Sequence, residues 1–211
     1  MQIAQDQVLA PVAKYYGDKV STHGATHLGV DWNSQASQEL RFAQLLRAAP
    51  TSLSFSVNDL GCGYGHLADY AARQGLTVDY RGIDVAEKMI DAARVLHANL
   101  GQCQFSVASA FSDAADISVA SGIFNVRLAA DDATWLAHIH RTIDHLFEMS
   151  EVGCAFNCLT AYSDADKKRD YLYYADPLAL FDYCRKRFGR HIALLHDYGL
   201  YEFTLIVRKH V

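Results

Sequence analysis

The sequence has no long apolar run, no basic block, no internal repeat and no low-complexity segment. No stretch approaches the roughly 20 apolar residues that a helix needs to cross a bilayer, and residues 1–6 lack the basic and apolar regions of a signal peptide. The 19 Lys and Arg residues against 24 Asp and Glu give a formal net charge of −5. Because phosphate binding needs clustered Lys and Arg, this charge argues against a nucleic-acid groove. We expect a cytoplasmic protein without membrane or nucleic-acid partners, and the oligomeric state is not indicated.

The cysteines lack a pairing pattern. There are five of them, an odd number, and none has Cys-x-x-Cys spacing. A thiol or metal site is one interpretation, and small core residues in a reducing compartment is the other, which we favour. No metal is expected. The length of 211 residues, with 51% hydrophobic and 20% charged residues, suits one globular domain.

Residues 53–65 hold the pattern around which the rest of the chain is organised. The apolar run from Leu53 to Leu60 is short and ends in glycines, which is typical of a buried strand. Glycines follow at the alternate positions 61, 63 and 65. Because glycine lacks a Cβ atom, the backbone can turn sharply there and a ligand can lie against it. A helix is expected to begin near His66, so the turn would bring a ligand to helix N–H groups.

Two acids distinguish this turn from a dinucleotide-binding fingerprint. Gly-x-Gly-x-x-Gly would need its third glycine at position 66, which is His66 here. Asp59 precedes the first glycine by two residues. Asp84 ends a second strand-like run, 77–83, and lies 19 residues beyond Gly65. At about this distance an acid can accept hydrogen bonds from ribose hydroxyls.

The segment Asp-Leu-Gly-Cys-Gly-Tyr-Gly at 59–65, followed by Gly-Ile-Asp-Val at 82–85, resembles the class I S-adenosylmethionine-dependent methyltransferases. The similarity covers about 55–211. The resemblance implies S-adenosylmethionine as the cofactor and S-adenosylhomocysteine as the product. It also implies a doubly wound, mostly parallel seven-stranded sheet with a C-terminal antiparallel hairpin, helices on both faces and an N-terminal helical lid.

Alternating strand and helix patterns along the chain agree with this α/β fold. The expected strands are 53–60, 77–84, 102–107, 116–124, 152–159, 191–196 and 201–209. The expected helices are 5–16, 34–49, 65–74, 86–100, 131–150 and 176–188, with Pro11 in the first turn of the first one. We expect residues 1–50 to form a lid over a cofactor-binding domain of residues 51–211, within a single compact unit.

The resemblance also assigns cofactor-binding residues. They are Asp59, Gly61, Gly63, Asp84, Val85, Met89, Ser109, Ala110, Phe111, Ser121 and Arg41. Many relatives have an acid near position 109 for the adenine amine, and this chain offers Ser109, or Asp113 if the loop curls back. Phe111 would stack on the adenine ring. Arg41 either meets the cofactor's carboxylate or is a surface charge.

The acceptor side is assigned from aromatic and polar residues. Aromatic faces attract a sulfonium cation, and tyrosine hydroxyls can bond an acceptor; the alternative is a half-buried aromatic rim. The candidate catalytic residues are Asn125, Tyr162 and Tyr174. The candidate substrate and lid residues are Tyr15, Tyr16, Trp32, Phe124, Tyr173 and His196. Asn125 is equally well explained as a turn residue and Trp32 as a core residue.

Two histidines, His138 and His145, share one face of the helix expected at 131–150, and we expect that face at the surface.

The predicted function is methyl transfer to an oxygen or nitrogen of a small-molecule acceptor by in-line displacement. A small acceptor is expected because the lid is short and no further domain is appended. One alternative is a cyclase or lyase of the azetidine-carboxylate type, which releases methylthioadenosine from the same cofactor. A non-catalytic binding module is another, and a nicotinamide-dependent dehydrogenase is disfavoured by the early third glycine.

Overall fold

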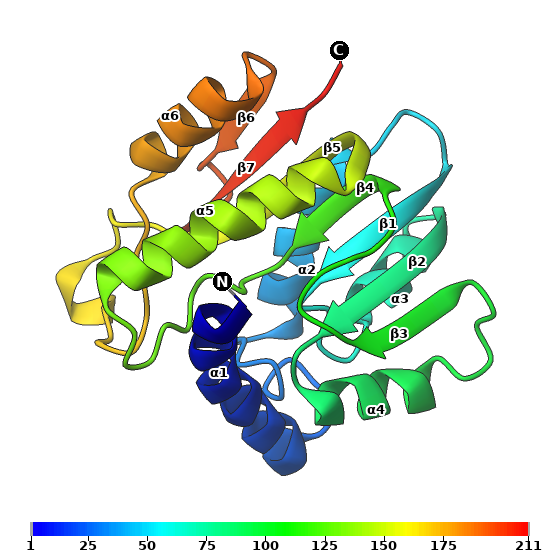
Figure 1. Cartoon of the computed structure of the whole chain (residues 1–211). Helices are drawn as coiled ribbons and strands as arrows, with labels where there is room; N and C mark the ends of the chain where they lie inside the picture. The colour runs from blue at the N-terminus through cyan, green and yellow to red at the C-terminus, as the bar shows by residue number, and fades with distance from the viewer. Residues whose placement is uncertain (1, 211) are drawn as a thin grey trace.

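A computed structural model describes residues 2–210 of the protein, with side chains from residue 8 onward. Its centre is a seven-stranded sheet in the order β3-β2-β1-β4-β5-β7-β6 (Figure 1). The first five strands in this order are parallel, and β7 lies antiparallel between β5 and β6. The strands are β1 (Ser54–Leu60), β2 (Thr77–Asp84), β3 (Cys103–Val107), β4 (Ala115–Ala120), β5 (Ser150–Leu159), β6 (Ile192–Leu195) and β7 (Glu202–Arg208). The predicted sheet and its C-terminal hairpin are confirmed.

Helices cover both faces of the sheet. They are α1 (Gln2–His23), α2 (Gln35–Leu45), α3 (His66–Arg73), α4 (Glu87–Leu96), α5 (Asp132–Glu148) and α6 (Pro177–Phe188). Because side chains alternate along a strand, Val57 of β1 packs with α2, α3 and α4, whereas Leu60 packs with α5 and α6. One large hydrophobic core therefore lies on each face of the sheet.

Helix starts follow local capping chemistry. The side chain of Ser34 accepts from the Ser37 N–H, and that of Asp131 accepts from the Thr134 N–H. Asp176 accepts two N–H groups, and Pro177 occupies the first helical position. These caps satisfy backbone donors that a helix start leaves free, and they fix where α2, α5 and α6 begin.

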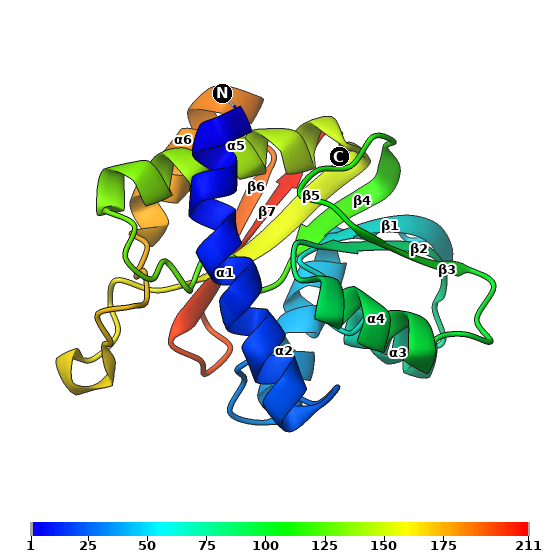
Figure 2. The same cartoon turned by 60° about the horizontal axis from the view of Figure 1, so that its bottom comes forward.

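Helix α1 differs from its prediction, because it spans 22 residues and Pro11 lies inside it rather than in its first turn. It crosses the carboxyl ends of the strands between α5 and α4 (Figures 1 and 2). Val12 joins the core formed with α5, and Val20 packs against Ala86 and Met89. Residues 108–114 connect β3 to β4 without a helix. No helix in the described part of the chain is long and apolar enough to span a membrane.

Candidate active site

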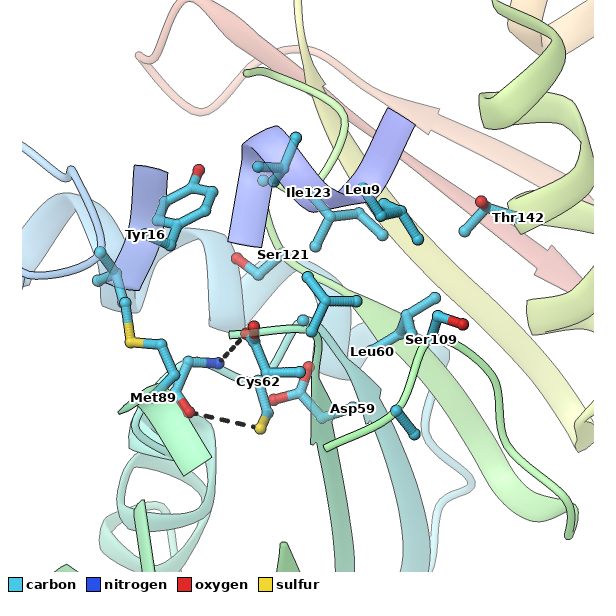
Figure 3. Close-up of a pocket in the computed structure, with 18 of the residues that line it drawn as sticks. Leu9, Tyr16, Asp59, Leu60, Cys62, Met89, Ser109, Ser121, Ile123 and Thr142 are labelled. Carbon is cyan, nitrogen blue, oxygen red and sulfur yellow. Dashed lines mark hydrogen bonds between the residues drawn. The ribbon is translucent and has the colours of Figure 1, made fainter. Parts of the chain in front are cut away.

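A cavity of about 910 Å³, counting the space open at its mouth, lies at the carboxyl ends of the central strands (Figure 3). This position is where open α/β sheets bind ligands. Its lining comes from α1, the segment after it, α2, the ends of β1, β2, β3 and β4, the start of α4, and α5. The lining residues are Leu9, Val12, Tyr16, Val30, Trp32, Gln38, Phe42, Asp59, Leu60, Gly61, Cys62, Gly63, Asp84, Val85, Met89, Ala108, Ser109, Ser121, Gly122, Ile123, His138 and Thr142.

The glycine-rich turn forms one wall of the cavity with its backbone. Gly61 and Gly63 have φ values of 72° and 54°, in the left-handed region that favours glycine. The N–H of Gly61 donates to the carbonyl of Ile83 at 2.8 Å, which ties the turn to β2. A Cβ atom on Gly61 would overlap the side chain of Ile123, and one on Gly63 would lie 2.9 Å from Val30 Cγ1. Only glycine leaves this backbone open to the cavity.

Asp84, at the end of β2, braces that turn. Its Oδ2 accepts from the Gly63 N–H at 3.0 Å and its Oδ1 from the Ala86 N–H at 2.8 Å. Burial raises the pKa of this carboxyl, opposed by hydrogen bonds from the backbone N–H groups of Ala86, Gly63 and Val85. Each carboxylate oxygen has capacity for a further hydrogen bond. Asp84 can therefore accept one hydroxyl on each oxygen, as binding of a ribose requires.

Asp59 brings a second carboxyl group to the cavity. It is 2% exposed, and its Oδ2 accepts from the Tyr80 hydroxyl at 2.5 Å. Its Oδ1 is buried without a hydrogen-bond partner among the described residues. Burial raises the pKa of Asp59 to about 7; the bond from Tyr80 lowers it and the charge of Asp84 raises it further. An unpartnered buried acceptor of this kind fits a cationic ligand group such as a sulfonium or ammonium.

His138 lies in the cavity wall, and the sequence prediction of a surface position for it is wrong. It is 4% exposed, its ring packs on Trp135, and its Nδ1 has no hydrogen-bond partner in the described chain. Burial lowers its pKa to about 4, and the charge of Arg141 adds to this effect. The imidazole is therefore neutral near pH 7. Ser121 Oγ is likewise buried and unpartnered within the residues described.

Ten residues predicted for cofactor or substrate line this single cavity. They are Tyr16, Trp32, Asp59, Gly61, Gly63, Asp84, Val85, Met89, Ser109 and Ser121. Ala110 and Phe111 are not in the lining, and Phe111 stacks on His145, which accepts from the Phe111 N–H at 2.9 Å. Stacking of Phe111 on an adenine ring does not fit this arrangement.

The Arg41 side chain is buried and pairs with another side chain of the protein. Its Nη2 lies 2.6 Å from Glu202 Oε1 and its Nε 2.8 Å from Glu202 Oε2, and both side chains are buried. Its Nη1 donates to the Ser37 carbonyl at 2.6 Å. The guanidinium carbon lies 3.8 Å from the ring centroid of Trp32. The expected contact between Arg41 and the cofactor's carboxylate is therefore replaced by an ion pair that supports Trp32.

Gln38, one turn before Arg41 on α2, lines the cavity and was missed by the sequence prediction. It is 4% exposed, and its Oε1 accepts from the Tyr64 hydroxyl at 3.2 Å. That bond orients the side-chain amide, whose Nε2 carries two donor hydrogens. Gln38 thus places an amide donor in the cavity, which Arg41 does not line.

The predicted catalytic residues lie outside the cavity lining. Asn125 Oδ1 accepts from the Leu159 N–H at 3.0 Å, which is the turn role left open by the sequence. Tyr162 is 61% exposed. The Tyr174 hydroxyl accepts from the Arg169 N–H at 2.9 Å in the segment after β5. A catalytic role for these three side chains does not fit this geometry.

The remaining predicted substrate residues have structural partners. The Tyr15 hydroxyl donates to Asp31 Oδ2 at 2.6 Å, which ties α1 to the segment that carries Trp32. Phe124 is fully buried in the core, and Tyr173 packs against the same core. His196 packs against the rings of Tyr162 and Phe203. None of these four lines the cavity.

Comparisons with known proteins agree with this fold and site. A family model described as a methyltransferase domain matches residues 57–153. A Mycobacterium tuberculosis (strain ATCC 25618 / H37Rv) protein, Rv1506c, provisionally named a methyltransferase, is 56% identical over 155 residues, which are 74% of this chain and 93% of that protein.

Solved structures show the same fold. The DhpI-SAM-HEP complex aligns with a TM-score of 0.66 at 12% identity, covering 95% of this chain and 97% of that one. The magnesium protoporphyrin IX methyltransferase of Synechocystis PCC 6803 with bound SAH aligns with a TM-score of 0.60 at 16% identity, covering 83% of each chain. The protein belongs to the methyltransferases, and its fold is that of the class I S-adenosylmethionine-dependent enzymes. The DhpI complex holds S-adenosylmethionine, and the Synechocystis enzyme holds its product.

Proposed function

We propose that the protein methylates an oxygen or nitrogen of a small-molecule acceptor that is enclosed in the cavity. One observation carries this proposal: the cavity is roofed by α1 and by Trp32, through Leu9, Val12 and Tyr16 of the helix. Residues 1–50 act as the lid in this proposal. A macromolecular acceptor would have to displace a 22-residue helix that packs on α4 and on the core.

Different residues of the chain hold different parts of the cofactor. When bound, the cofactor supplies a methyl group that is already activated on a sulfonium. Asp84 accepts the ribose hydroxyls, and the open backbone at Gly61 and Gly63 receives the amino-acid part. The Gln38 amide donates to a carboxylate, and Asp59 balances positive charge. Holding a nucleophile in line with a methyl group supplies several kcal/mol of the barrier, so positioning is the main contribution of the protein.

Transfer of a labelled methyl group tests the proposal. Purified protein is incubated with methyl-labelled S-adenosylmethionine and a cell extract, and the products are separated by size. We expect the label in small molecules, together with S-adenosylhomocysteine as the co-product. Label found only in protein or nucleic acid would contradict the proposal. Methylthioadenosine in place of S-adenosylhomocysteine would favour the cyclase chemistry.

Substitution of Asp84 tests the assigned ribose contact. Asp84→Asn removes the charge that strengthens hydrogen bonds from two hydroxyls, so affinity for S-adenosylhomocysteine should fall by about tenfold to a hundredfold in calorimetry. Asp91→Asn, an exposed position on α4, is the matched control. Equal affinity of both variants would show that Asp84 does not hold the ligand.

A further inference from the structure

The cavity extends beyond the glycine-rich turn toward α5. Figure 3 shows Met89 and Tyr16 on one side, and Thr142 and Ser109 on the opposite side, with Leu60 between them. The groups suited to the cofactor's ribose and amino acid, Asp84 and the turn at 61–63, belong to the ends of β1 and β2, and Ser109, expected at the adenine, follows β3. The end of the cavity formed by α5 is left for another ligand.

The α5 end offers hydrogen-bond acceptors in apolar surroundings. His138 and Thr142 are one helical turn apart and both line the cavity, together with Leu9, Val12 and Leu60. The Thr142 hydroxyl already donates to the His138 carbonyl at 2.9 Å, so its oxygen is left with acceptor capacity. The buried imidazole has its unpartnered Nδ1, and a neutral imidazole has one accepting nitrogen. Both side chains therefore suit a ligand that donates a hydrogen bond.

The charged residues of the cavity lining further limit which ligands can bind. Among the described residues that line it there is no lysine or arginine, whereas Asp59 and Asp84 bring two carboxyl groups. An anionic acceptor would lose its hydration there without gaining a protein cation in exchange, and the positive charge of the cofactor's sulfonium is already balanced by Asp59 in the proposed function. A molecule with a phosphate or carboxylate group is thus disfavoured.

We propose that the α5 end of the cavity binds the methyl acceptor, and that this acceptor is a neutral, largely apolar molecule whose hydroxyl donates to the imidazole of His138. The inference rests on the proposed function. In the transfer, a lone pair of the hydroxyl oxygen forms the new O–C bond while the C–S bond breaks and leaves its electron pair on sulfur. The hydroxyl proton passes to the imidazole of His138, which later returns it to water.

Binding of three small probes tests the inference without turnover. Phenol, toluene and benzoate share a ring but differ as a neutral donor, an apolar isostere and an anion. They are titrated, with and without S-adenosylhomocysteine, while the ring nitrogen resonances of His138 are followed by NMR. We expect phenol to bind about fivefold more tightly than toluene and to shift the His138 signals, since one net hydrogen bond distinguishes the two. Benzoate should not bind.

Substitutions of His138 test whether this residue causes the preference for phenol over toluene. His138→Leu should abolish the preference for phenol over toluene, and His138→Gln, which keeps an acceptor, should restore part of it. His140→Leu is the matched control, because that histidine stacks on Tyr183 at 3.8 Å, outside the cavity lining. If His138→Leu does not fold, His138→Gln still tests the role of His138.

Three results would overturn the inference: equal binding of phenol and toluene, no response of His138, or an unchanged preference in both His138 variants. Calorimetry with S-adenosylhomocysteine on the unmodified protein is independent of all three. Its failure would count against the proposed function itself, whereas cofactor binding without phenol selectivity would remove only the role of the α5 end.

Discussion

Two buried carboxyl groups lie close together at the ends of β1 and β2, and their hydrogen bonds separate their roles. Asp84 is bonded by backbone N–H groups on both oxygens. Asp59 has one bond, from the Tyr80 hydroxyl, and an orphaned Oδ1. Because burial and the charge of Asp84 raise the pKa of Asp59 to about 7, Asp59 is the group whose protonation changes near neutral pH.

Stability should therefore fall as Asp59 ionises. Its pKa in the folded protein is raised to about 7 from an ordinary value of 3.8. The folded state thus holds a proton that the unfolded state has lost, so stability declines as the pH rises from about 4 to about 7 and then levels off. The decline has an upper bound of about 4 kcal/mol. Asp59→Asn, which still accepts from Tyr80, should lack this contribution.

Urea unfolding at pH 5, 6, 7 and 8 checks this prediction. As the pH rises over this range, the free energy of unfolding of the unmodified protein should fall relative to that of Asp59→Asn. Asp182→Asn, a change at an exposed position on α6, serves as the control. A constant difference between Asp59→Asn and the unmodified protein would mean that Asp59 does not change protonation in this range.

At the scale of elements, a closed set of contacts joins α2, β4, β5 and β7. The Gly122 N–H donates to Asn157 Oδ1 at 2.9 Å, and Asn157 Nδ2 donates to Glu202. Glu202 pairs with Arg41, which stacks on Trp32. The Trp32 ring in turn fills the space where a side chain on residue 122 would lie. Trp32 is thus held in place by a buried ion pair behind it.

Loss of one partner of that pair should be costly. Arg41→Met leaves Glu202 buried without its counter-charge, and such changes destabilise proteins by about 3–5 kcal/mol. The double variant Arg41→Met/Glu202→Gln should recover a large part of the loss, because no uncompensated charge remains. Thermal and urea unfolding of the single and double variants measure this. A single variant of unchanged stability, or a double variant no more stable than the single one, would contradict it.

Elements whose signals are local were predictable from the sequence. Strand β2 lies at 77–84 as predicted, because buried and more exposed residues alternate along a strand-like run that ends in Asp84. Helix α6 begins where Asp176 and Pro177 place a cap. Helix α1 was underestimated because Pro11 suggested a helix start, whereas packing of Val12 and Tyr16 on the rest of the molecule outweighs the interior proline.

Part of the cavity lining was predictable in the same local sense. Gly61, Gly63 and Asp84 follow from strand ends and spacing. Arg41 was expected at the cofactor, whereas it pairs with Glu202, 161 residues away, and no local pattern reveals such a pairing. His138 was missed for a similar reason: its burial depends on which residues of α1 and β1 lie across from α5.

At the scale of the whole molecule, helix α1, which precedes every strand in the sequence, covers the site. The connection between β3 and β4 has no helix, and α1 lies across the strand ends between α4 and α5 (Figure 2). Leu9, Ala10 and Ala13 of α1 also face Val107 and Ala108 at the end of β3, around a second, more open hollow. A ligand in the cavity is therefore in contact with a helix that closes over it.

Closure by α1 should make ligand binding visible in hydrogen exchange. If release of S-adenosylhomocysteine requires α1 to open, saturation at 100 times the Kd should slow exchange of amides in residues 9–20 by about a hundredfold. Amides of α6, which does not contribute to the cavity lining, should keep their rates and serve as the internal control. Mass-spectrometric exchange with and without the ligand measures both segments. Tight binding with unchanged exchange in α1 would mean that ligands enter past Trp32 instead, without any opening of the helix.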